Sequence, residues 1–377
     1  MPIGYLITLF LLGVCALAAL WRPRRMSRKQ YFLAVAINEL SHVAAVWLVL
    51  VNLLAWSEGD LDGWRGAVLV PLSAVLMIGL VELTRRALRA GPAVDAVVRE
   101  HGGRPVRSRS RLLRPLLFPI PWRPRSVTRI GPLSYGEHRR QRLDVHRPKD
   151  TSVRGPVLVY FHGGGYFSGS NRREGRALLH HLAAQGWVCI SATYRVRPSA
   201  DFTDHLADAR AVLRWAHKRA DVHGGDPRTL VMAGSSAGAH LTSLCALTQE
   251  PSDPDRPRVD AAVCLYGWYG RYYGRGPDES PVSTPLALDT SNAPPFLIAH
   301  GDHDSWAPVE DARALHDHLT AGSPRATWYV ELPGAQHGFD ALYSWRIAAV
   351  IDGVDAFLDK VLDVPAATAR PGDESRV

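Results

Sequence analysis

The chain has 377 residues and a formal net charge of +8, but the charge is unevenly distributed. Residues 1–125 hold 17 Lys and Arg against 7 Asp and Glu, whereas residues 126–377 hold 27 against 29. The length favours two structural regions, and the near-neutral second region is not built electrostatically to bind nucleic acid. The basic first region is typical of a membrane protein with positively charged cytoplasmic segments.

Three apolar segments in the first region predict transmembrane helices, so that residues 1–84 form a three-helix membrane region. Ile3–Trp21 has no charged residue, and no basic residue precedes it. Both features favour a retained span over a cleaved signal peptide. Tyr31–Trp56 is the second predicted span, and Ala67–Val81 is the core of the third.

The charges between these spans predict their orientation. The connection at 22–30 carries five basic residues, whereas the connection at 57–63 carries three acidic residues. By the positive-inside rule, the first connection lies in the cytoplasm and the second lies outside. We therefore expect a multi-pass protein of the cytoplasmic membrane, with the chain after Leu83 on the cytoplasmic side.

Four polar residues, Asn38, Glu39, His42 and Asn52, lie within the second predicted span. Their spacing keeps them near one helical face. Such a stripe packs membrane helices together through hydrogen bonds, or it forms a functional polar site, because ionisable groups are costly in a bilayer. The sequence leaves both interpretations open, with packing as the default.

Residues 85–125 form an Arg-rich junction with eleven Arg and two acidic residues. Prolines at positions 115, 119 and 121 argue against a long helix near its end. Basic and apolar side chains are interleaved there, as in a segment lying on an anionic membrane surface. A solvated linker has the same composition, so both interpretations stay open.

From residue 126 to 363, strands alternate with helices, which predicts an α/β fold class with a mostly parallel sheet covered on both faces. Residues 364–377 are rich in Pro, Ala and charge and predict a disordered tail. The predicted strands are Arg142–His146, Pro156–Phe161, Trp187–Ser191, Thr229–Ala233, Val259–Tyr266, Pro295–Ala299 and Thr327–Glu331, and the predicted helices include His205–His223, Ala237–Leu247 and Ser344–Leu362.

Three of the four cysteines, Cys189, Cys245 and Cys264, lie in this region, and Cys15 lies in the first span. All have apolar neighbours and none has metal-site spacing, so we expect buried small apolar side chains, as in a reducing compartment. No metal or organic cofactor is implied by any motif.

The run Gly234-Ser235-Ser236-Ala237-Gly238 lies between a predicted strand and a predicted helix. A serine on such a sharp turn takes a strained backbone conformation with its hydroxyl pushed outward, and the two flanking glycines avoid collisions with the neighbouring strand and helix. The turn also places the serine at a helix N-terminus. Ser236 is therefore the predicted nucleophile.

A serine hydroxyl needs a base, and His337 is the predicted one because it lies on the loop after the strand 327–331. The base in turn needs a carboxylate, and both Asp302 and Asp304 follow the strand 295–299. The chain order Ser…Asp…His is that of one particular hydrolase fold. Negative charge on a reaction intermediate would be bound by the amide of Ala237 and by the glycine loop at 163–165.

Three segments, Phe161-His162-Gly163-Gly164-Gly165, Gly224-Gly225-Asp226-Pro227 and Gly234 to Leu241, resemble the hormone-sensitive-lipase-like branch of the α/β-hydrolases. The likeness is especially to actinobacterial membrane-anchored lipases and carboxylesterases. It covers roughly residues 126–362 and implies an eight-stranded, mostly parallel sheet.

The resemblance also implies roles for single residues. Family members carry the acid in a His-Gly-x-x-Asp pattern before a Val/Ala-Pro pair, which here selects Asp304 and leaves Asp302 as a turn residue. The implied triad is Ser236, Asp304 and His337. The amides of Gly163, Gly164 and Ala237 carry over as the oxyanion hole.

Two positions depart from the family pattern, because many members have an acidic residue where Ser235 stands and Gly where Ala239 stands. The run from Ser236 to Leu241 is also similar to formamidase-type relatives. The expected function is a membrane-anchored serine carboxylesterase or lipase, and the alternatives are an amide or formamide hydrolase and an acyltransferase with the same triad. A receptor without activity would not need His337.

The lid of the acyl pocket is expected either in Tyr266–Gly274 and the loop to Asn292 or in the Arg-rich junction. Its aromatic residues could equally serve as plain packing. The natural substrate and its acyl chain length are not predicted by the sequence.

Overall fold

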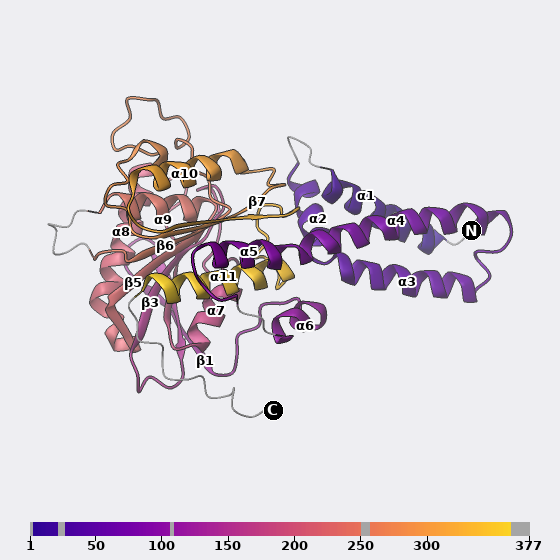
Figure 1. The fold of residues 1–377 in the computed structure, drawn as a ribbon, viewed down its shortest axis with the longest axis horizontal. Helices are drawn as coiled ribbons and strands as arrows, with labels where there is room; N and C mark the ends of the chain where they lie inside the picture. Colours follow the sequence, from indigo (N-terminus) through magenta and orange to yellow (C-terminus); the bar gives the residue numbers. More distant parts are fainter. Residues whose placement is uncertain (1–2, 22–26, 106–108, 250–256, 363–377) are drawn as a thin grey trace.

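The structure is a computed structural model that describes residues 3–21, 27–105, 109–249 and 257–362. The predicted tail at 364–377 lies outside the described residues. An all-helical part and a mixed α/β part lie end to end along the longest axis of the molecule (Figure 1).

Four helices are found in the described residues of the first part, and all of them contribute to a small apolar cluster that includes Ile37, Leu48 and Leu80. Large apolar side chains also cover the outside of these helices, and Phe10 and Ile78 are each 69% exposed. The helices are α1 (Ile3–Leu20), α2 (Arg28–Glu39), α3 (Ser41–Ser57) and α4 (Trp64–Leu88).

Two helical runs among the described residues, Ile3–Leu20 and Trp64–Glu100, are long and apolar enough to cross a membrane. The second predicted span is not a continuous helix, because the chain bends by 83° between α2 and α3. By length and composition the number of spans is therefore two, or three if the bent pair is one span.

The residues of the polar stripe in the second predicted span have two kinds of partner. Asn52 on α3 donates to Ser73 on α4 and accepts from Tyr5 on α1, which is the expected packing of helices. Asn38 and Glu39 on α2 instead contact the α/β part of the chain. His42 on α3 lies 3.2 Å from the carbonyl oxygen of Pro115 in the junction. The expected packing among the membrane helices is therefore found for Asn52, whereas these three residues have partners outside the helical part.

The Arg-rich junction contains two helices, α5 (Ala90–Glu100) and the short α6 (Arg109–Leu117). Helix α5 buries Ala90, Val94 and Val98 in the core of the α/β part. By contrast, six apolar side chains in α6 and in the segment after it are 44–65% exposed. They are Leu113, Leu116, Leu117, Phe118, Ile120 and Trp122.

The α/β part contains one eight-stranded sheet with the order β1-β2-β4-β3-β5-β6-β7-β8. The pairs β1–β2 and β2–β4 are antiparallel, and all the other pairs are parallel. The strands are β1 (Val127–Ser134), β2 (Arg142–Pro148), β3 (Gly155–Phe161), β4 (Val188–Ala192), β5 (Gly225–Ser235), β6 (Ala261–Leu265), β7 (Phe296–Gly301) and β8 (Thr327–Leu332).

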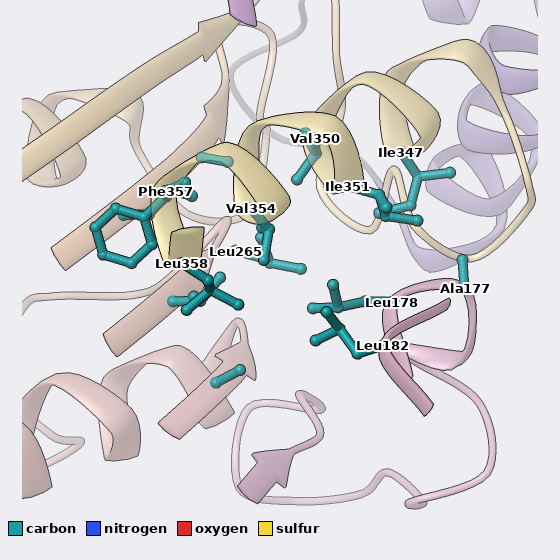
Figure 2. Packing of buried hydrophobic residues seen from close by; sticks show 14 of the residues in the cluster. Ala177, Leu178, Leu182, Leu265, Ile347, Val350, Ile351, Val354, Phe357 and Leu358 are labelled. Carbon is teal, nitrogen blue, oxygen red and sulfur yellow. The ribbon is translucent and has the colours of Figure 1, made fainter. Parts of the chain in front are cut away.

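Helices cover both faces of this sheet, as the alternating pattern predicts. Helices α5, α7 and α11 pack on one face, and Figure 2 shows α11 and α7 meeting through residues such as Val354 and Leu182. Helices α8, α9 and α10 pack on the other face. These helices are α7 (Arg176–Ala184), α8 (Phe202–Arg219), α9 (Ala237–Leu247), α10 (Val309–Gly322) and α11 (Trp345–Val361).

Candidate active site

Ser236 lies on the sharp turn between β5 and α9. Its backbone has φ 52° and ψ −119°, a conformation that non-glycine residues rarely adopt and that stores strain. A Cβ added at Gly234 would lie 2.3 Å from the carbonyl oxygen of Gly238, and one added at Gly238 would lie 2.0 Å from that of Phe161. The two glycines are therefore required for the close approach that holds this turn.

The structure brings the three predicted side chains into one hydrogen-bonded line. His337 lies on the loop after β8, and its Nε2 is 2.9 Å from the Ser236 Oγ. Its Nδ1 is 2.7 Å from Oδ2 of Asp304, which lies on the loop after β7. His337 and Asp304 are buried, whereas Ser236 is partly accessible.

The two candidate carboxylates have different surroundings. Asp304 meets the imidazole with one oxygen, while its other oxygen accepts hydrogen bonds of 2.8 Å from the amides of Trp306 and Ala307. Asp302 instead accepts from the amide of Gly334 at 2.6 Å. The geometry therefore favours Asp304 as the partner of His337 and Asp302 as a residue that binds local backbone.

The pKa values of this pair shift in opposite directions. Burial alone would raise the pKa of Asp304, but the adjacent His337 and His300 hold it well below its usual value. Burial alone would lower the pKa of His337, but Asp304 and two further carboxylates, Glu174 and Asp340, hold it above 6.5. An ionised Asp304 beside a basic imidazole suits a base that must accept the serine proton.

The glycine loop after β3 differs from the expected oxyanion hole at one position. The amide of Gly163 donates to the Glu174 carboxylate, so it is not available to a substrate oxygen. Gly164 and Gly165 follow with φ values of 108° and 59°, which favour glycine. Within the described residues, no hydrogen bond engages the amides of Gly164, Gly165 and Ala237.

Two carboxylates next to the site, the half-buried Glu174 and the buried Asp340, were missed by the sequence reasoning. Glu174 accepts from the Ser235 hydroxyl at 2.6 Å as well as from Gly163, so a carboxylate lies beside the position where many family members carry their own acid. Asp340 accepts from the amide of Gly175 and the hydroxyl of Tyr266. Burial raises the pKa of both acids.

Of these two acids, only Asp340 could have been found from the sequence, because it directly follows the His337-Gly338-Phe339 motif. Glu174 lies eleven residues after Gly163, with no pattern that marks it. Its role is visible only once the loop that contains it folds back under the glycine loop.

The aromatic segment after β6 is mostly core. Tyr266, Tyr269 and Tyr272 are at most 5% exposed, as expected for plain packing. Tyr273 is 48% exposed, and its hydroxyl is 3.4 Å from the position that a Cβ on Gly165 would take. Tyr273 therefore lies at the rim of the glycine loop.

Comparison with known proteins identifies the fold of the part of the chain that holds this site. Residues 143–267 match the BD-FAE family model. The apo form of Thermogutta terrifontis esterase 2 superposes with a TM-score of 0.53 and 24% identity, over 63% of this chain and 95% of that one. This part of the chain has the α/β-hydrolase fold. The predicted eight-stranded, mostly parallel sheet is thereby confirmed.

Two curated relatives come from Mycobacterium tuberculosis. Esterase LipC is 37% identical over 257 residues, which cover 60% of this chain and 64% of the relative. The probable carboxylic ester hydrolase LipM is 35% identical over 281 residues, which cover 66% of this chain and 65% of the relative. The chain thus spans somewhat less than two thirds of the length of these relatives, and its predicted resemblance to esterases is confirmed over that part.

Proposed function

We propose that this α/β-hydrolase cleaves carboxylic esters through an acyl-enzyme on Ser236. The observation that carries the proposal is the hydrogen-bonded line from Ser236 through His337 to Asp304. The names of the relatives, which are esterases or carboxylic ester hydrolases, support esters as the substrate class.

In the first half of the reaction, the Ser236 oxygen attacks the ester carbonyl carbon while His337 Nε2 takes the hydroxyl proton. The carbonyl oxygen becomes negatively charged and accepts hydrogen bonds from the amides of Gly164, Gly165 and Ala237. Asp304 stabilises the imidazolium. The bond from the carbonyl carbon to the leaving oxygen then breaks, and the alcohol departs with the proton that His337 returns.

In the second half, a water molecule attacks the acyl-serine, and His337 takes one of its protons. The same amides bind the oxygen again. The bond from the carbonyl carbon to the Ser236 oxygen breaks, the proton returns to that oxygen, and the free acid leaves. An acyltransferase would use an acceptor alcohol in place of water.

We further propose that residues 1–84 anchor this domain in the cytoplasmic membrane, with residues 85–125 joining them to a catalytic domain at 126–363. The apolar exteriors of α1, α3 and α4 and the exposed apolar side chains at 113–122 support contact with lipid. The acidic connection at 57–63 lies at the end of the helical part remote from the sheet (Figure 1). This supports three spans with the catalytic domain in the cytoplasm.

The substrate class is tested with full-length protein in detergent or vesicles, using p-nitrophenyl esters of several chain lengths and aryl formamides. We expect hydrolysis of the esters with at least tenfold higher kcat/KM than of the formamides. Preferential cleavage of formamides would favour the amide hydrolase. Transfer of the acyl group to an added alcohol in excess over hydrolysis would favour the acyltransferase.

The pH dependence of kcat/KM follows from the raised pKa of His337. The imidazole must be neutral to accept a proton, so activity is lost as the pH falls through a pKa above 6.5. The charge of Glu174 contributes to this elevation. Replacing it in Glu174→Gln should therefore move the acidic limb of the pH profile to lower pH.

Glu310→Gln is the matched control, because Glu310 is an exposed acid at the start of α10. Its profile should coincide with that of the wild type. An acidic limb that stays in place in Glu174→Gln would contradict the electrostatic coupling of Glu174 to His337.

A further inference from the structure

The loop that carries His337 is fixed by residues of helix α2, which is distant in sequence. Asn38 donates its side-chain amide to the carbonyl oxygen of Gly334 at 2.8 Å. The Tyr31 hydroxyl donates to the carbonyl oxygen of His337 itself at 2.8 Å. Two backbone carbonyls of the loop, one of them on the catalytic histidine, therefore depend on one N-terminal helix.

Tyr31 also contacts the acid side of the triad. Its ring is stacked on Trp306, with ring centroids 4.1 Å apart and planes inclined by 26°. The backbone amide of Trp306 in turn donates to Asp304 at 2.8 Å. Tyr31 is only 7% exposed, so its hydroxyl is held in place between the two loops that meet in the Asp304–His337 pair.

Helix α2 is docked on the hydrolase domain by a buried ion pair. Glu39, the last residue of α2, lies 2.9 Å from Nη1 of Arg346 on α11, and both side chains are fully buried. Arg346 also donates to the carbonyl oxygens of Asn38 and Pro333. Removing one partner of a buried pair leaves an uncompensated charge, so this contact fixes where α2 lies.

We propose that Tyr31 is a positioning residue of the active site, through which the N-terminal helices hold the imidazole of His337 on Ser236. The proposal rests on the proposed esterase function. According to this proposal, residues 1–84 do more than anchor the chain, because helix α2 donates hydrogen bonds to the loop that carries the catalytic base. The 83° bend after α2 then has a function, since it turns α2 away from the direction of α3 and onto the site.

Tyr31→Phe tests the proposal in the full-length chain, because it removes only the hydroxyl and keeps the ring against Trp306. The loss of one hydrogen bond that orients the base should lower kcat by about five- to tenfold, with KM within twofold of the wild type. Tyr31→Leu also removes the stacking and should lower kcat further.

Tyr5→Phe is the matched control, because it also removes a tyrosine hydroxyl from the helical part. The Tyr5 hydroxyl donates to Asn52 rather than to any residue of the active site. It should keep the kcat of the wild type. Equal kcat values in Tyr31→Phe and the wild type would overturn the inference, as would equal losses in Tyr31→Phe and Tyr5→Phe. A wild-type protein without ester hydrolysis would overturn the proposed function and this inference together.

Discussion

Ser236→Ala should abolish ester hydrolysis, with a loss of about 10⁴-fold or more in kcat. The variant lacks the attacking oxygen, so no acyl-enzyme forms, and residual catalysis comes only from the oxyanion hole and substrate binding. Because the strained turn is fixed by Gly234 and Gly238 rather than by the serine hydroxyl, the variant should fold normally. Initial rates with a p-nitrophenyl ester and the thermal unfolding temperature measure the two properties.

Ser243→Ala is the matched control for this experiment. Ser243 lies on helix α9, which begins directly after Ser236, and its hydroxyl donates to the carbonyl oxygen of His240 rather than to any triad residue. Its kcat should remain close to that of the wild type. Hydrolysis that continues undiminished in Ser236→Ala would mean that another group performs the chemistry.

Asp304→Asn should lower kcat by about 10³- to 10⁴-fold while it preserves the fold. The amide has nearly the same shape, but it cannot stabilise the imidazolium, and it favours the wrong tautomer of His337. Loss of the negative charge also lowers the pKa of His337, since Asp304 contributes to its elevation. The acidic limb of the remaining activity should therefore lie at lower pH than in the wild type.

Asp302→Asn separates the two carboxylates that follow β7. Asp302 accepts from the Gly334 amide, which a neutral side-chain oxygen can also do, so we expect less than a tenfold loss. The opposite ranking of the two variants would mean that the imidazole turns toward Asp302 in solution. The assignment of the acid from the structure would then be wrong.

Local sequence patterns predicted most of the α/β part and the meeting of the triad. Alternating apolar strands and amphipathic helices carry their own periodicity, and the turn at Ser236 carries its own glycines. The expected helix at Ala237–Leu247 is found with these bounds, and the expected strand at Thr229–Ala233 lies within the longer β5, Gly225–Ser235. The resemblance selected Asp304 over Asp302, because both aspartates follow the same strand.

The sequence could not predict contacts between segments that are far apart. The apolar composition of Tyr31–Trp56 indicated one continuous span, whereas Asn38 and Glu39 find partners about 300 residues later in the chain. The site of the bend is therefore set by tertiary contacts with Gly334 and Arg346. The mean hydropathy of a sequence window contains no information about partners that are distant in the sequence.

The same limit applies to the oxyanion hole. Resemblance implied Gly163, but the amide of that residue is occupied by Glu174, which no local pattern marks. The helix at Ala90–Glu100 was likewise hidden in an Arg-rich stretch, although its buried residues recur with helical spacing. The high Arg content of this stretch suggested a linker or a surface segment, whereas the spacing of its apolar residues indicated the helix.

We propose that Ser236, activated by His337, is the nucleophile of this chain. Mass spectrometry of the full-length protein after reaction with a serine-directed organophosphate such as paraoxon tests this assignment. We expect a single covalent adduct on the peptide that contains Ser236 and no measurable adduct in His337→Ala. An adduct on a different serine would show that Ser236 is not the nucleophile, and equal labelling of Ser236 with and without the imidazole would show that His337 does not activate it.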